Sequence, residues 1–120
     1  MHQRMFLKNY MIFFVDKESF MRKLADIKDA ENKYYEILWY ERHKVLVARG
    51  LIDKYLNSGE SDKVEIAKKA IAKAKQVEEK YKDEYDFNKN GYDDFDFGMI
   101  NGKLSALRWV LGEEWDSLDT

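Results

Sequence analysis

The chain has 120 residues, contains neither proline nor cysteine, and carries 21 basic against 23 acidic side chains, a formal net charge of −2. This length bounds the chain to a single domain with a modest core. The missing cysteine excludes disulfide scaffolds, thiol catalysis and cysteine-based zinc sites, and it fits a reducing, cytoplasmic compartment. The nearly balanced charge gives no reason to expect nucleic acid as the partner.

The composition indicates an all-α fold. Proline breaks helices, so its complete absence favours long uninterrupted ones, and 45% hydrophobic with 37% charged residues is what amphipathic helices require. We predict one helical domain over residues 1–120, a small bundle in which a long antiparallel helical hairpin packs against a third, buried helix.

Residues 1–15 are the least regular part of the pattern. Tyr10–Val15 is a short apolar run that periodicity alone assigns to neither a strand nor a helix. It is far shorter than the roughly 20 residues that cross a bilayer, so we expect no membrane segment. We interpret residues 1–15 as a docking segment that covers the core, with an exposed partner-binding arm as the alternative.

Two periodic segments form the predicted hairpin. Residues 16–56 repeat apolar side chains at three- and four-residue steps, which predicts a long helix capped by Asp16 and bent near Gly50. Turn-forming residues at 57–61 separate it from a second predicted helix over residues 62–85, in which Asp62 and Glu65 have the spacing of a capping box. An alanine-rich seam lets this second helix lie close against the first.

Residues 98–111 predict the third helix, which Gly112 ends. One of its faces is made mostly of small residues, and the opposite face is made of large aliphatic ones. The small-residue face comprises Gly98, Gly102, Ser105, Ala106 and Trp109. The aliphatic face comprises Ile100, Leu104, Leu107 and Leu111. A surface helix needs only one apolar face, so we expect this helix at the centre of the molecule or at a homodimer contact.

Arg108 falls in the remaining sector of that helix, beside Trp109, and both are candidate binding residues. We expect the guanidinium of Arg108 to be partly enclosed and therefore paired with a carboxylate. Glu31, Glu41 or an aspartate of the preceding loop are the available partners.

The segment GMINGKLSALRWVLGEEWDSLDT (98–120) resembles the C-terminus of small uncharacterised bacterial and phage proteins, and LWYERH (38–43) is similar to a block in the same group. Together the two segments cover about a quarter of the chain. The resemblance implies a microbial or viral cytosolic protein, and it transfers no catalytic residue.

The acidic loop predicted at residues 86–97 contains the first half of an EF-hand pattern. Asp86, Asn88 and Asn90, followed by Gly91, place oxygen ligands at alternate positions before a glycine. The twelfth position is Phe97, so the carboxylate that should close a calcium site is missing. We predict a plain turn and no cofactor, with Ca²⁺ or Mg²⁺ as the alternative. The aspartates that follow could attract a cation or a basic partner: Asp93, Asp94 and Asp96.

The densest block of chemically capable side chains is Trp39, Tyr40, Glu41, Arg42 and His43. Apolar residues surround it on nearly every side of the helix, so its ionisable groups should be paired. Helical spacing places Glu36, Tyr40 and His43 on one flank. This flank is either a satisfied hydrogen-bonded network or, with Trp39, the lining of a ligand pocket.

The sequence lacks the residues that several classes of enzyme require for catalysis. One usable histidine and no cysteine cannot build a zinc or di-iron site, and no phosphate-binding glycine loop occurs. The lysines of residues 62–85 alternate with carboxylates, which argues against nucleic acid as the partner.

We predict a non-catalytic protein–protein interaction module, regulatory or inhibitory, of bacterial or phage origin. It would bind a partner protein, itself, or both, with a homodimer forming through apolar surface and with the acidic segments 86–96 and 113–119 as the electrostatic contact surfaces. The alternative is a ligand- or metal-binding protein that uses residues 86–96 or the pocket around Trp39 and His43.

Overall fold

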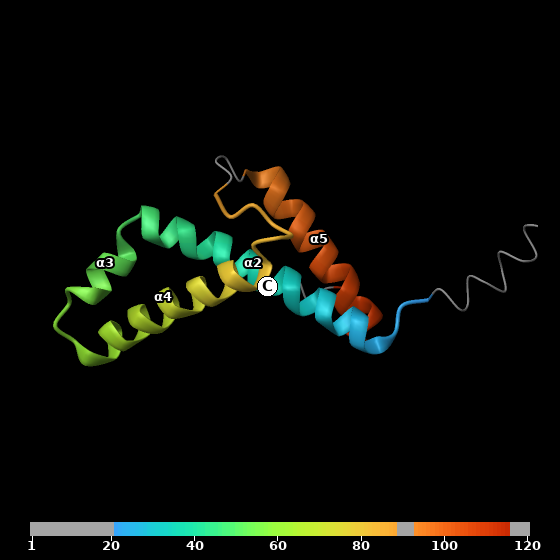
Figure 1. The fold of residues 1–120 in the computed structure, drawn as a ribbon, viewed down its shortest axis with the longest axis horizontal. Coiled ribbons are helices and arrows are strands. Elements are labelled where there is room, and N and C mark those ends of the chain that lie inside the picture. The colour runs from blue at the N-terminus through green and yellow to red at the C-terminus, as the bar shows by residue number, and fades with distance from the viewer. Residues whose placement is uncertain (1–20, 89–92, 116–120) are drawn as a thin grey trace, which may run out of the picture.

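The computed structural model describes residues 21–88 and 93–115, and this part of the chain is helical with no strand. The helices are α2 (Leu24–Ala48), α3 (Leu51–Leu56), α4 (Ser61–Tyr81) and α5 (Asp94–Val110) (Figure 1). The all-α fold class is confirmed. The proposed docking segment at residues 1–15 lies outside the described residues. None of the described helices is both long and apolar enough to cross a membrane.

Glycine turns shape the hairpin. Gly50, with φ at 75°, separates α2 from the short α3, and Gly59, with φ at 74°, turns the chain into α4. These left-handed values favour glycine, which has no Cβ to clash with the backbone. The bend predicted near Gly50 is therefore a complete break. α4 then returns alongside α2, as the hairpin prediction requires, and α3 bridges the far end (Figure 1).

The helix boundaries differ from the prediction in three places. α2 begins at Leu24 with Lys23 as its N-cap, and the proposed cap Asp16 lies outside the described residues. The capping box at Asp62 and Glu65 is wrong. The turn at Gly59 starts α4 earlier, so Glu60 is the N-cap and makes no side-chain cap. The chain also leaves the helix after Tyr81 rather than Tyr85, because residues 82–84 form a turn.

α5 starts earlier than the predicted helix at 98–111. Asp93 is its N-cap and accepts a hydrogen bond from the backbone N–H of Asp96, while the Asp96 carboxylate accepts one from the backbone N–H of Asp93. This reciprocal pair satisfies two backbone donors that would otherwise lack partners at the helix start. The last four residues of the predicted acidic loop, 94–97, are thus the first turn of a helix.

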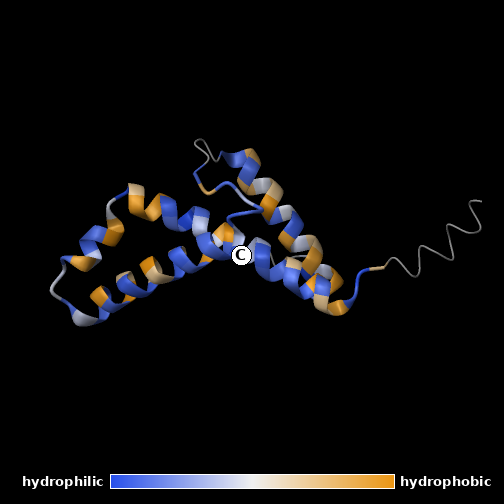
Figure 2. Cartoon of the chain, viewed as in Figure 1, coloured by the Kyte–Doolittle hydropathy of each residue, from blue (hydrophilic) through white to orange (hydrophobic). Residues whose placement is uncertain are grey.

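The core lies where α2, α4 and the segment after α4 meet. α2 contributes Ile37 and Tyr40, α4 contributes Ala74, Val77 and Tyr81, and Phe87 folds back onto them from the following segment. Hydrophobic and hydrophilic residues alternate along the helices, as expected of elements that each bury only one side (Figure 2).

The helix at the centre of the molecule is α2 and not α5. α2 contacts α3, α4 and α5, whereas α5 contacts α2 alone among the described helices. Within α5 only Leu104 is buried. The length of α2 explains this arrangement, because its C-terminal half pairs with α4 and leaves its N-terminal half for α5. The two-sided burial predicted for residues 98–111 is therefore not found in the described chain, where one apolar face of this helix stays exposed.

Candidate functional site

The block at residues 39–43 lies in the middle of α2, where the hairpin and the segment after α4 converge. Tyr40, Glu41 and His43 are buried, Trp39 is half-buried and Arg42 is exposed. Burying a carboxylate and an imidazole among apolar side chains is costly unless each finds polar partners. The partners of each group therefore decide what this region can do.

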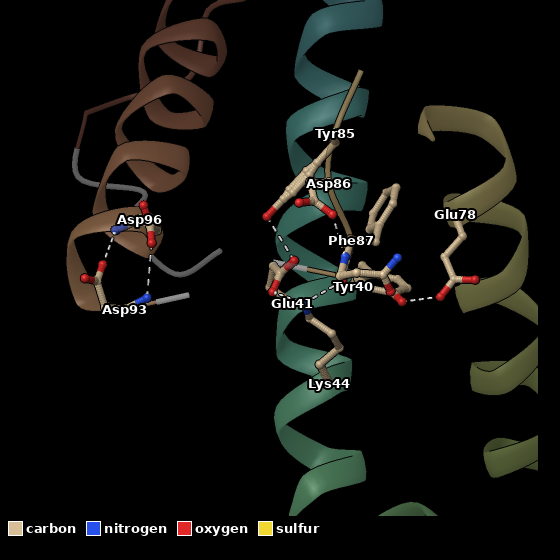
Figure 3. Close-up of polar contacts among 10 residues, drawn as sticks. Tyr40, Glu41, Lys44, Glu78, Tyr85, Asp86, Phe87, Asp93 and Asp96 are labelled. Carbon is tan, nitrogen blue, oxygen red and sulfur yellow. Dashed lines mark hydrogen bonds and ion pairs between the residues drawn. The ribbon is translucent and has the colours of Figure 1, made fainter. Parts of the chain in front are cut away.

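Glu41 is only 1% exposed, and its carboxylate has two partners. Lys44, one turn further along α2, places its Nζ 2.9 Å from Oε1, and the Tyr85 hydroxyl donates to Oε2 at 2.9 Å. Lys44 also donates to the backbone carbonyl of Phe87 at 3.0 Å. Figure 3 shows Tyr85 and Phe87 reaching across to α2 from the segment after α4. Glu41 thus anchors this segment to the middle of α2.

Tyr40 points the other way, toward α4 (Figure 3). Its hydroxyl donates a hydrogen bond to the carboxylate of Glu78, and its ring meets the edge of the Phe87 ring at 4.5 Å between centroids. Burial, together with the bonded and charged Glu78, raises the pKa of Tyr40 well above its ordinary value of 10.0. Tyr40 therefore stays protonated at neutral pH and acts as a hydrogen-bond donor.

A second polar link joins α2 to α4 one turn away. Glu36 accepts hydrogen bonds from the Tyr81 hydroxyl at 2.7 Å and from Lys80 at 3.1 Å. Burial alone would raise the pKa of Glu36, but these bonds and the charges of Lys80 and Lys73 lower it below its ordinary value of 4.5. The network predicted for Glu36, Tyr40 and His43 is thus two separate cross-links from α2 to α4, and His43 belongs to neither.

His43 lies instead beside Trp39, with the rings stacked at a centroid distance of 5.1 Å and an interplanar angle of 11°. It is 8% exposed and has no hydrogen bond or ion pair with any residue of the described chain. Burial lowers its pKa below the ordinary value of 6.5, against the opposing charge of Glu78. Trp39 and His43 both line a groove of about 410 Å³. The two residues that the sequence predicted to line a ligand pocket therefore share one groove, and ligand binding there stays a prediction.

Arg108 is partly enclosed, and its Nε lies 3.4 Å from a carboxylate oxygen of Glu31. Of the partners considered from the sequence, the structure therefore selects Glu31. The guanidinium also lies over the ring of Tyr35, at 5.7 Å from the centroid. Its neighbour Trp109 is 49% exposed and stacks on Trp115 at 5.1 Å between ring centroids.

Three of the four aspartates proposed for cation binding accept hydrogen bonds from the backbone. Asp86 accepts a hydrogen bond at 3.0 Å from the backbone N–H of Asn88, which makes an Asx turn. Asp93 and Asp96 form the cap of α5, and Asp94 is exposed in its first turn. Asn90 and Gly91 lie outside the described residues. Residues 21–88 and 93–115 contain no group of three or more carboxylates or histidines placed to hold a metal ion.

Sequence reasoning missed Lys44, Glu78, Tyr85 and Phe87 as parts of this region. Lys44 carried a local signal, because it follows Glu41 by the three residues that bring side chains together on a helix. Tyr85 lies 44 positions from Glu41, and no pattern along the chain announces such a contact.

No family model, no curated protein and no solved structure matches this chain. The resemblance of residues 98–120 and 38–43 to small bacterial and phage proteins therefore stays a prediction, and the functional argument depends on geometry.

Proposed function

We propose that the protein is a non-catalytic protein–protein interaction module that pairs with a second copy of itself through α5. We further propose that it acts in the cytoplasm of a bacterium, or of a phage-infected one, as a regulatory or inhibitory protein. The observation that carries the pairing is that α5 is apolar on two faces and buries only one of them. The buried face contains Leu104, and the other is turned away from α2.

The second face, which we call the outer face of α5, follows the steps of three and four residues that keep side chains on one side of a helix. Its large members are well exposed, at 73% for Phe95, 48% for Met99, 49% for Trp109 and 56% for Val110. Contiguous apolar surface of this kind on a soluble chain marks an interaction site more often than it marks a free surface.

The centre of the outer face is smooth. A Cβ atom added to Gly98 or Gly102 would meet nothing within 4 Å, so the backbone is open to a close approach there. Ala106 is exposed and continues this shallow surface. Phe95 stands toward one end of the helix, Trp109 and Val110 stand toward the other, and Met99 lies beside the glycines. A second helix can therefore lie close along the middle of α5 and contact large side chains at both ends.

The pattern is also symmetric, which favours a second copy as the occupant. Phe95 and Trp109 lie equally far along the chain from Gly102, on opposite sides of it. If two α5 helices cross antiparallel at Gly102, Phe95 of each copy meets Trp109 of the other. A two-fold dimer requires such a self-complementary patch.

The test is the concentration dependence of molecular mass, measured by sedimentation equilibrium. We expect a dimer for the wild type and a dissociation constant at least tenfold weaker for Met99→Glu, because a buried charge would face the partner without a counterion. Ile66→Glu is the matched control, since Ile66 is 57% exposed on α4, away from the outer face. A monomeric wild type, or equal weakening by both variants, would refute the pairing.

A further inference from the structure

A groove lies at the far end of the hairpin, between the C-terminal half of α2, α3 and the first half of α4. Its volume of about 410 Å³ falls within the range of about 300–1,000 Å³ typical of small-molecule sites. Most of its lining is aliphatic: Leu46, Leu51, Ile52, Ile66, Ala67 and Ala70. The groove is separate from the outer face of α5 and from the Glu41 contacts.

His43 is the buried polar group of this lining. Its side chain is more than nine-tenths buried, and no described residue offers it a hydrogen bond. A buried imidazole without a partner leaves both a donor and an acceptor unsatisfied, which costs stability unless something in the groove meets them. The stacked Trp39 ring holds the imidazole in one plane.

The charge at the groove is positive. Arg42 is the one ionised side chain among the described lining residues, is exposed, and has no ion pair within the described chain. Lys73 adds a second cation nearby, with its Nζ 4.4 Å from the centroid of the Trp39 ring. No carboxylate belongs to the described lining, although the charge of Glu78 acts on His43 from α4.

We propose that this groove binds a small amphiphilic carboxylate, with its aliphatic tail against the leucine and isoleucine side chains and its carboxylate paired with Arg42. The imidazole of His43 donates a hydrogen bond to the same carboxylate. Charge complementarity selects an anion over a cation, and the apolar lining selects an aliphatic body over a sugar or a nucleotide. This site does not depend on self-association through α5.

Calorimetric titration of the full chain with octanoate, octanol and octylammonium tests the proposal. The three probes share one tail and differ in the charge of the head group. We expect octanoate to bind at least tenfold more tightly than octylammonium, and Arg42→Gln to weaken octanoate at least tenfold while leaving octanol unchanged. Arg49→Gln is the control, because Arg49 is exposed at the end of α2 and lies outside the groove lining.

A second variant locates the site. Ala70→Leu places a larger side chain in the groove, so we expect it to abolish octanoate binding. If Ala70→Leu does not fold, Arg42→Gln still decides the question, because an exposed side chain can be changed without disturbing the core. The proposal is overturned if octanoate does not bind or if the three probes bind equally. It is also overturned if Arg42→Gln and Arg49→Gln have the same effect, or if a folded Ala70→Leu variant binds octanoate as the wild type does.

Discussion

The hydroxyl of Tyr85 donates a 2.9 Å hydrogen bond to the carboxylate of Glu41, a side chain that is 1% exposed in the middle of α2. The contact joins residues 44 positions apart and fixes the segment after α4 against the longest helix. Through it, a buried charge that would otherwise destabilise the fold becomes an anchor for the chain between α4 and α5 (Figure 3).

Removing that hydroxyl should therefore be costly. We expect Tyr85→Phe to lower the free energy of unfolding by about 1.5–3 kcal/mol, the range for a hydrogen bond to a charged group. Urea denaturation followed by circular dichroism measures the change. Tyr34→Phe is the control, because Tyr34 makes no side-chain hydrogen bond in the described chain, and it should cost under about 0.5 kcal/mol. Equal losses in the two variants would contradict the anchoring role.

Among the aspartates at the start of α5, Asp93 should stabilise the fold through its capping role. We expect Asp93→Ala to destabilise the protein by about 1 kcal/mol, because it removes the side-chain acceptor of the capping box. Asp94→Ala, in the same acidic stretch but exposed and outside the box, should cost less than half as much. The same denaturation experiment compares them. If the two variants were equally destabilised, the cap would not be the reason that these acids are present.

The free energy of unfolding should decrease as the pH is lowered, because of His43. Burial lowers the pKa of His43 in the folded state, so the unfolded chain takes up a proton first as the pH drops through about 6.5. The free energy of unfolding should then decrease from pH 7 downward until the lowered folded-state pKa is passed. His43→Gln, which cannot ionise, should flatten the curve between pH 7 and pH 5. An unchanged slope in this variant would place the effect elsewhere.

The ion pair between Arg108 and Glu31 should contribute only modestly to the stability of the fold. Both side chains keep some exposure, at 18% and 27%, so solvent screens the attraction. A double-mutant cycle with Arg108→Gln and Glu31→Gln should give a coupling energy of about 0.5–1 kcal/mol in low salt. The coupling should shrink in 1 M salt, where the Debye length is about 3 Å. A coupling that does not change with salt would mean that packing, and not charge, joins these residues.

Local patterns in the sequence were enough to predict the helical fold, a change of direction near Gly50 and the enclosed Arg108, although the bend expected at Gly50 is a complete break. Periodicity and spacing along the chain determine these features. The start of α5 was missed because the aspartates that cap it also fit half of a metal-loop pattern. Its position was missed for another reason. Two apolar faces on α5 predicted burial on both sides, whereas among the described helices only α2 packs against it and the other face stays exposed.

The sequence allowed us to predict which residues make up the site at 39–43, but not which side chains from other segments contact them. Helical spacing brought Trp39 and His43 together correctly. It also grouped Glu36, Tyr40 and His43, which the structure separates, because the side chains that bind Glu36 and Tyr40 come from α4. Contacts between distant segments depend on the packing of the whole fold.

Disulfide trapping tests pairing through α5 most directly, because the native chain has no cysteine to interfere. In Gly102→Cys the two introduced thiols would face each other across the two-fold axis, within the roughly 4.4–6.8 Å between Cα atoms that a disulfide spans. Lys75→Cys, on the exposed side of α4, is the control. The account predicts a covalent dimer under mild oxidation for Gly102→Cys and none for Lys75→Cys. The absence of a dimer from Gly102→Cys, or equal cross-linking of both variants, would contradict it.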